Sequence, residues 1–301
     1  MSGPVRPFRF GVNMVGFGSG EEFRQRCRRA EEQGYDTIHV PDHLGLCAPF
    51  PALAAAAGVT ERPRLGTFVL NAGFWNPALL AREVATVDQL SGGRLELGLG
   101  AGYVKAEHDQ AGLPFASPGG RVDHLEHTVT ELTRLLADPE HAPRPVQEPV
   151  PLLIGGNGDR VLKLAARTAA VAAFTGGRQV PGGPEGTMEL ISPGELEERT
   201  RTALAFAEEA RERDEPPELN YLIQYVAQTS DPGEALERLR PYGPRMSDEE
   251  LLSHPALLLG SPKEMAEQLR AHRERFGFSY FTVLDPYMDD FALVVEELHG
   301  S

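Results

Sequence analysis

The residues best suited to chemistry are a carboxylate and an imidazole that stand side by side after a short β-rich run. Thr37–Val40 is followed by Pro41, Asp42 and His43. Imidazole titrates near neutrality, so a histidine can take up or release a proton, and a neighbouring carboxylate can orient its ring or contact a bound molecule. Single histidines are more often structural, but a position directly after a strand favours function. We therefore predict that Asp42 and His43 are catalytic, in proton transfer.

Glycines follow two further β-rich runs and leave space for a ligand or for another stretch of backbone. Gly98, Gly100 and Gly102 alternate, which removes side chains from one face of a strand. Gly155-Gly156-Asn157-Gly158 leads into a predicted helix that starts near Asp159. The backbone N–H groups of such a turn can bind an anion, although the spacing is not that of a dinucleotide-binding motif. An ordinary turn is the alternative interpretation.

The elements that would position these residues alternate regularly along the chain. Helical patterns separate the β-rich runs; one such pattern places Phe23, Cys27 and Ala30 on a single face. Repeated strand–helix alternation predicts one α/β domain over residues 1–301, a (β/α)8 TIM barrel whose active site lies at the carboxyl ends of the strands. The eight predicted strands are Phe8–Met14, Thr37–Val40, Arg64–Leu70, Leu95–Leu99, Pro151–Ile154, Val171–Thr175, Leu219–Ala227 and Phe278–Leu284.

Residues that end helices support this division of the chain. Asn76 can cap a helix that Pro77 opens, and Ser91-Gly92-Gly93 can end it. Within that helix the pattern predicts one buried face. Its members are Leu80, Val84, Val87 and Leu90.

Three connections are longer than a barrel needs, after predicted strands 4, 6 and 7. They cover residues 103 to 120, Gly176–Leu190 and Asp231–Gly277, and the last has patterns for two or three helices. Gly177–Pro184 is too rich in glycine and proline to predict a regular element. Long loops at this end of a barrel are often lids, so we expect the second loop to be mobile. Its Arg178 is a candidate to bind an anionic cofactor, with a solvated arginine as the alternative.

Composition excludes several other functions. A net charge of -15 and a pI near 5.1 argue against nucleic acids and anionic membrane surfaces as partners. The apolar stretches are too short to span a membrane, and the first ten residues do not resemble a signal peptide, so we expect a cytoplasmic protein. Cys27 and Cys47 form neither a disulfide framework nor a metal site. His108, His124 and His127 lack a convincing further ligand, so no metal is expected and we predict that they are surface or dimer-face residues.

Specific likeness to a known superfamily extends over most of the chain. It is strongest from Leu65–Asn71 through Asn76–Glu83 to Asp88–Gly102, and Pro151–Gly158 and Phe278–Val283 extend it. It is weakest from about residue 177 to 260. These motifs resemble the luciferase-like monooxygenase superfamily, which includes bacterial luciferase, alkanesulfonate monooxygenase and deazaflavin-dependent oxidoreductases. Within it, the chain most resembles a subgroup that uses coenzyme F420, a 5-deazaflavin.

The resemblance implies roles for particular residues. His43 would lie at the deazaflavin ring and handle the proton that accompanies hydride transfer. A non-prolyl cis peptide near Phe68-Val69 would back the ring, and Gly155–Gly158 would hold the phosphate side of the cofactor. The predicted cofactor-binding residues are Phe68, Val69, Asn71, Gly100, Gly102, Gly155, Gly156, Asn157, Gly158, Thr175 and Arg178.

Departures from the superfamily bear on the substrate. The sugar-phosphate dehydrogenases carry a catalytic glutamate where this chain has Tyr103, so their activity is not expected here. Many relatives have Arg-His-Pro where this chain has Trp75-Asn76-Pro77. Phe17, Phe74, Trp75 and Tyr103 are candidates to line an apolar substrate pocket.

Three functions are compatible with these observations. The first is an F420-dependent oxidoreductase, expected to be an F420H2-dependent reductase of a small organic or natural-product substrate. The second is a monooxygenase that uses FMNH2 supplied by a partner reductase, and the third is a barrel without catalytic activity. The Asp42-His43 pair disfavours the third. By analogy with related barrels we expect a homodimer.

Overall fold

The computed structural model describes residues 6–180, 188–210, 215–229 and 231–299. Eight parallel strand positions form a closed barrel, because β3, at one end of the sheet order, also pairs with β5 near the other end. The order is β3-β2-β1-β13-β10-β7-β6-β5-β4. The predicted (β/α)8 barrel is therefore confirmed. Nine strands occupy the eight positions, because β3 and β4 share one and both pair with β5. The barrel strands are β1 (Arg9–Asn13), β2 (Thr37–Val40), β3 (Arg64–Thr67), β4 (Leu70–Asn71), β5 (Leu95–Gly100), β6 (Leu152–Gly155), β7 (Val171–Phe174), β10 (Glu218–Ile223) and β13 (Phe278–Leu284).

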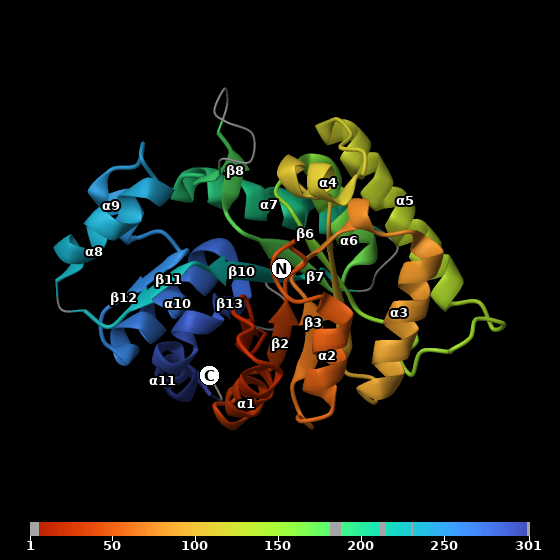
Figure 1. The fold of residues 1–301 in the computed structure, drawn as a ribbon. Coiled ribbons are helices and arrows are strands. Elements are labelled where there is room, and N and C mark those ends of the chain that lie inside the picture. The colour runs from red at the N-terminus through yellow and green to blue at the C-terminus, as the bar shows by residue number, and fades with distance from the viewer. Residues whose placement is uncertain (1–5, 181–187, 211–214, 230, 300–301) are drawn as a thin grey trace.

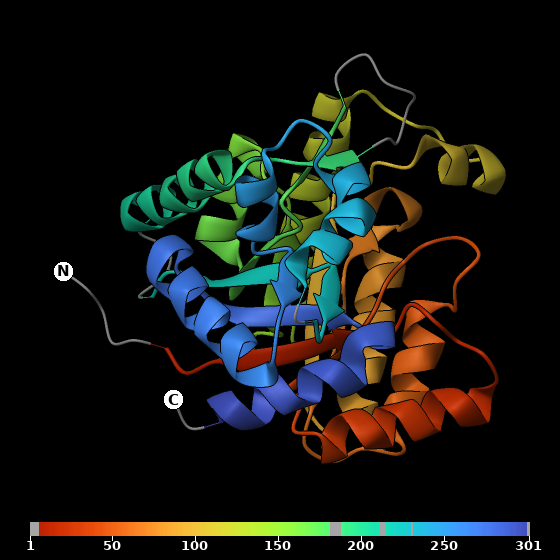
Figure 2. The same cartoon turned by 90° about the vertical axis from the view of Figure 1, so that its left-hand side faces the viewer.

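Helices surround the strands (Figure 1), with α2, α3 and α5 on one side of the barrel and α1, α10 and α11 on the other. In Figure 2, α4 stands away from the body of the molecule. The helices are α1 (Gly20–Glu32), α2 (Pro49–Ala57), α3 (Pro77–Leu90), α4 (Lys105–Ala111), α5 (Pro118–Leu136), α6 (Asp159–Thr168), α7 (Pro193–Glu209), α8 (Pro232–Leu239), α9 (Asp248–Leu252), α10 (Pro262–Phe276) and α11 (Met288–Leu298).

The predicted caps and helical faces are largely confirmed. Phe23, Cys27 and Ala30 are the buried residues of α1, and the Asn76 side chain accepts hydrogen bonds from the first N–H groups of α3. The exception is Leu90, which is 60% exposed although it was predicted to share a buried face with Leu80. Ten residues rotate a helix by about 1000°, which leaves Leu90 roughly 80° away from Leu80.

Predicted strand 3 is broken, which corrects the continuous run Arg64–Leu70. β3 ends at Thr67 and β4 begins at Leu70, and the Phe68-Val69 peptide between them is cis, as the resemblance implied. The neighbouring strand makes room for this irregularity. The Gly98 N–H donates to Thr67 Oγ1 at 2.9 Å, and a Cβ at Gly98 would collide with the Thr67 backbone oxygen.

Two further predictions were wrong, one about a loop and one about a strand. Gly177–Pro184 was not expected to hold a regular element, yet β8 (Gly177–Gln179) pairs antiparallel with β9 (Met188–Leu190). Residues 181–187 between them lie outside the described residues, so the lid expectation is untested there.

Predicted strand 7, Leu219–Ala227, divides into β10 and β11 (Tyr225–Ala227), and β11 pairs with β12 (Leu257–Leu259) outside the barrel. The strand turns because the N–H groups of residues 224 and 225 both donate to the Ala256 oxygen.

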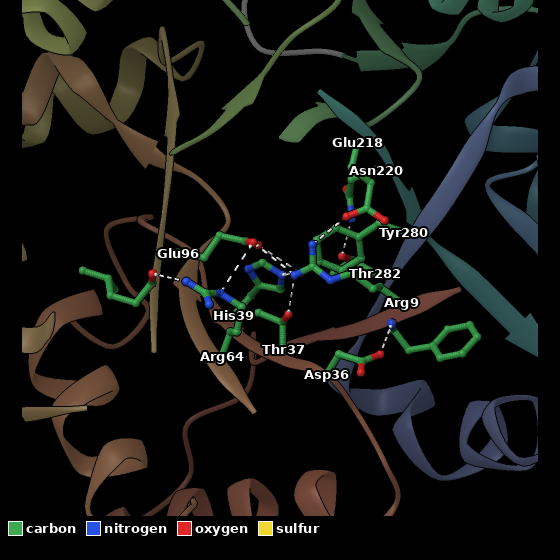
Figure 3. Close-up of polar contacts among 12 residues, drawn as sticks. Arg9, Asp36, Thr37, His39, Arg64, Glu96, Glu218, Asn220, Tyr280 and Thr282 are labelled. Atoms are coloured by element: carbon green, nitrogen blue, oxygen red, sulfur yellow. Dashed lines mark hydrogen bonds and ion pairs between the residues drawn. The ribbon is translucent and has the colours of Figure 1, made fainter. Parts of the chain in front are cut away.

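A buried polar network crosses the inside of the barrel (Figure 3). Arg9 contacts Glu218 at 2.6 Å and Glu96 at 3.1 Å, and the Tyr280 hydroxyl donates to the second Glu96 oxygen at 3.3 Å. His39 Nε2 lies 2.6 Å from the same hydroxyl. Burial lowers the pKa of His39 to about 4, which keeps its ring neutral. These residues come from β1, β2, β5, β10 and β13, so the network joins strands from opposite sides of the barrel.

Removing one charge from this network should destabilise the whole domain. Glu96 is 3% exposed, and without its carboxylate Arg9 loses half of its compensation inside the barrel. Glu96→Ala is expected to reduce the free energy of unfolding by about 3–5 kcal/mol, measured by urea denaturation. The matched control is Glu267→Ala, which breaks an exposed pair with Arg270 and should cost less than about 1 kcal/mol. Equal effects of the two substitutions would contradict a structural role for the network.

Candidate active site at the carboxyl ends of the strands

Asp42 connects the end of β2 to the strand that follows the cis peptide. Its carboxylate accepts hydrogen bonds from the Trp75 indole N–H at 2.9 Å and from the Asn71 backbone N–H at 3.2 Å. The side chain is buried, and burial raises the pKa of its carboxyl. Asp42 thus fixes the relative positions of two strand ends, and neither of these hydrogen bonds involves the His43 ring.

The carboxylate that holds His43 is Glu107, which the sequence did not single out. His43 Nδ1 lies 2.8 Å from Glu107 Oε1, and the Tyr103 ring meets the imidazole edge-on with the ring centroids 6.2 Å apart. Glu107 lies in the first turn of α4 and is 15% exposed, whereas His43 is 38% exposed. A carboxylate at Nδ1 favours the tautomer that carries its proton there, so Nε2 is the nitrogen able to exchange a proton with a ligand.

A second histidine, His108 of α4, contacts Asn71 at the end of β4. His108 is buried, with Nε2 at 2.9 Å from Asn71 Nδ2 and Nδ1 at 3.0 Å from the Pro114 oxygen. The prediction that His108 lies on the surface or a dimer face is therefore wrong. The error arose because α4 has only 7 residues, too few for an apolar pattern to indicate which side of the helix faces inward. Asn71 Oδ1 also accepts the Gly73 N–H, and a Cβ at Gly102 would collide with this carboxamide.

Gly100 and Gly155, two of the other glycines predicted to contact the cofactor, lie next to Val69. A Cβ at Gly100 would lie 2.8 Å from one Val69 methyl, and a Cβ at Gly155 would lie 3.3 Å from the other. These glycines therefore accommodate the chain at the cis peptide. Their contact with a cofactor stays a prediction, as does that of Phe68, which is 7% exposed and meets the His39 ring edge-on.

The turn after β6 leads into α6 as predicted. Gly158 is the N-cap residue and makes no side-chain cap, so no described side chain satisfies the first N–H groups of the helix. Asn157 Nδ2 donates to the Gly177 oxygen at 2.7 Å, whereas its buried Oδ1 has no hydrogen-bond partner among the described residues. Gly156 has a positive φ of 151°. This turn presents donors suited to an anion.

Thr175 and Arg178 lie beyond β7. The exposed Thr175 accepts the Gly177 N–H at its hydroxyl, at 3.3 Å. Arg178 contacts Glu189 at 2.9 Å and Glu195 at 2.5 Å, so its guanidinium is already paired within the chain. Cofactor binding by Arg178 stays a prediction, and it would require ligand phosphates to compete with both carboxylates.

Two further features are absent from the described residues. Within these ranges, no cluster of three or more His, Cys, Asp or Glu side chains is arranged to hold a metal ion. No helix in the described part of the chain has the length and apolar character that a membrane span requires.

Comparison with known proteins relates this geometry to a family. An F420-dependent glucose-6-phosphate dehydrogenase of Intrasporangium calvum is 27% identical over 317 residues, covering 88% of this chain and 90% of that protein. A solved F420-dependent secondary alcohol dehydrogenase, in complex with an F420-acetone adduct, superposes with a TM-score of 0.77 at 19% identity, over 97% of this chain and 98% of that one. A solved long-chain alkane monooxygenase superposes with a TM-score of 0.75 at 14% sequence identity, over 98% of this chain and 91% of that one.

The two structural similarities show a shared barrel, which dehydrogenases and monooxygenases have in common. Membership of a family rests on the sequence itself. The model of the family described as luciferase-like monooxygenase matches residues 5–280, nearly the whole chain. The resemblance predicted from the motifs is confirmed, and the chain belongs to the luciferase-like monooxygenase family.

Proposed function

We propose that this protein is an oxidoreductase that transfers hydride between coenzyme F420 and a small organic substrate, in the direction of an F420H2-dependent reductase. The observation that carries the proposal is the His43–Glu107 pair, 2.8 Å apart. His43 follows β2, and the Val40 oxygen at the end of that strand accepts the N–H of Phe68, the first residue of the cis peptide Phe68-Val69. The 27% identical relative that is named as F420-dependent supports the choice of cofactor. A homodimer and a cytoplasmic location are further parts of the proposal, by analogy.

The described residues fit an anionic deazaflavin cofactor. The start of α6 offers N–H groups that no described side chain caps, and these suit the anionic part. Asn157 Oδ1 is a buried acceptor without a partner among the described residues, and it suits a hydroxyl or N–H donor of the cofactor. In this proposal, Gly155–Gly158 hold the phosphate side of the cofactor, and Val69 supports its ring. Bound F420H2 would supply the hydride, since deazaflavins carry two electrons.

The chain itself contributes proton management and orientation. His43 Nε2 donates or accepts the proton that balances hydride transfer. Glu107 keeps the imidazole in the required tautomer and direction, and Asp42 fixes the end of β2 through Trp75 and Asn71. Tyr103, where sugar-phosphate dehydrogenases carry a catalytic glutamate, contributes an aromatic wall.

An FMNH2-dependent monooxygenase is the second candidate. It is favoured by the fold similarity to the long-chain alkane monooxygenase, since the same barrel serves that protein. The two candidates differ in their co-reactant. The test is to follow oxidation of F420H2 under anaerobic conditions with a panel of neutral ketones and enones. Turnover without oxygen supports the proposal. Substrate oxidation that requires FMNH2 and oxygen would establish the alternative.

Glu107→Gln should lower kcat without unfolding the protein. The amide keeps the size of the side chain, but it is uncharged and holds the imidazole less firmly. We therefore expect kcat to fall by about tenfold, as is usual when a residue that orients a functional histidine is replaced. The direct readout is the ¹⁵N spectrum of His43, in which the population of the Nδ1–H tautomer should fall. Asp109→Asn on the same helix alters only an exposed pair with Lys105 and should leave both readouts unchanged. An unaltered His43 spectrum in Glu107→Gln would refute the positioning role.

A further inference from the structure

An open cavity of about 490 Å³ lies between the loops that follow β1 and β2 and the helices α1 and α2. Its lining is mainly apolar and includes Phe17, Phe23, Leu46, Cys47, Pro51 and Ala55. The volume is within the range of small-molecule sites, which are concave, largely apolar and few in number.

The wall that carries Phe17 is held rigidly. The N–H groups of Val15 and Gly16 donate to Asp285 Oδ1 at 3.0 and 3.3 Å. Arg26 contacts the other Asp285 oxygen at 2.6 Å and also donates to the backbone oxygens of Gly16 and Phe17. Phe17 nevertheless leaves 40% of its surface exposed, with its ring centroid 5.4 Å from that of Phe23. A loop braced in this way presents an apolar surface without having to reorganise, which lowers the cost of binding.

The cavity is next to the proposed catalytic histidine. The Leu46 N–H donates to the His43 backbone oxygen at 3.1 Å, so one tight turn connects His43 to the cavity wall. The neighbouring Leu44 is 40% exposed, Leu46 39% and Tyr103 44%. Exposed large apolar side chains in a group mark interaction sites more often than isolated ones do. Of these residues, Leu46 lines the cavity and Tyr103 contacts the His43 imidazole.

The charges beside the cavity are already compensated. Arg24, which lines it, donates to Glu21 at 2.8 Å, and Arg26 is paired with Asp285. A phosphate or carboxylate on a ligand would have to displace one of these partners. The site thus disfavours an anionic group and favours an uncharged apolar one, because its main gain is burial of apolar surface.

We propose that this cavity binds the hydrocarbon part of an uncharged substrate, a neutral ketone or enone whose carbonyl lies toward His43. This rests on the proposed reductase function and adds the substrate class to it. The balanced reaction delivers hydride from F420H2 to the carbonyl carbon, or to the β-carbon of an enone. A proton from His43 completes the reduced product. The cofactor leaves as oxidised F420, and the proton that it gives up with the hydride passes through solvent and restores the protonated His43.

Cys47 provides a test that does not depend on turnover. It is half-buried and lines the cavity, whereas Cys27 is fully buried, so alkylation of the folded protein by N-ethylmaleimide reads Cys47. Its rate is measured by mass spectrometry with 2-octanone, 2-butanone, octanoate or glucose 6-phosphate, with and without F420. We expect protection by 2-octanone at the lowest concentration. Each added methylene should tighten binding by up to about fourfold, and the two anions should protect weakly or not at all.

Two variants separate occupancy of the cavity from other effects. Ala55→Leu should fill part of the cavity and weaken protection by 2-octanone at least tenfold, while Ala78→Leu, an exposed alanine on α3, should leave it unchanged. Cys47→Ser should abolish labelling of the folded protein. Equal protection by the anions, or none by 2-octanone under either condition, would overturn the proposal. Labelling that slows only as protein concentration rises would instead make this a contact between copies. If 2-octanone protects Cys47 but the protein does not bind F420, the cavity proposal is upheld and the cofactor assignment is rejected.

Discussion

Replacement of His43 by asparagine is expected to lower kcat by about 10²–10⁴-fold, the usual contribution of general acid–base catalysis. Asparagine keeps a polar side chain but cannot take up or release a proton near neutral pH. The affinity for F420 should change far less, because the proposed ring contact comes from Val69 and the proposed phosphate contacts come from the end of β6 and the turn after it. Steady-state kinetics and a calorimetric titration of each variant separate the two effects.

The control for this substitution is His127→Asn, which changes an exposed histidine on α5 and should keep native kinetics. Near-native turnover of His43→Asn would show that another group handles the proton. Loss of F420 binding together with turnover would make His43 a binding residue instead.

Gly98→Ala is expected to have the largest effect on stability, a loss of more than about 4 kcal/mol or failure to fold. The new Cβ would collide with the Thr67 backbone oxygen, which cannot move aside as a flexible side chain could. The Thr67 hydroxyl also holds the two strands together, because it donates to the Gly98 oxygen and accepts the Gly98 N–H. The measurement is urea denaturation, with thermal unfolding as a second readout.

Gly119→Ala is the matched control. A Cβ at this position meets no described atom within 4 Å, and alanine favours the helix α5 in which it lies. This variant should be as stable as the parent or slightly more so. If Gly98→Ala lost less than about 1 kcal/mol, the close approach of β3 to β5 would not constrain the sequence.

The sequence was informative wherever local signals and the global fold agreed. Alternating strand and helix patterns predicted the barrel, and Asn76 and Pro77 predicted the start of α3, because capping acts within one turn of the chain. The break in strand 3 could not be derived from its residue types. It depends on the space left by Gly98 on the neighbouring strand, and only the family resemblance placed a cis peptide there.

The candidate site was predicted only in part for a similar reason. His43 was selected as a candidate because it follows a strand. Its partner Glu107 lies 64 positions later, on a helix inside a long connection, and nothing in the local pattern distinguishes it from an exposed glutamate. His108 was misplaced because its burial depends on Asn71, a contact between distant segments. Pairing across loops is a tertiary property that residue spacing does not encode.

The choice of cofactor is the central claim, and direct binding tests it. The purified protein is titrated calorimetrically with F420 and, separately, with FMN under identical conditions. We predict micromolar or tighter binding of F420 and at least about tenfold weaker binding of FMN. Gly158→Asp, which adds a carboxylate at the uncapped start of α6, should weaken the F420 affinity. Preferential binding of FMN, or an F420 affinity that Gly158→Asp leaves unchanged together with native stability, would contradict the account.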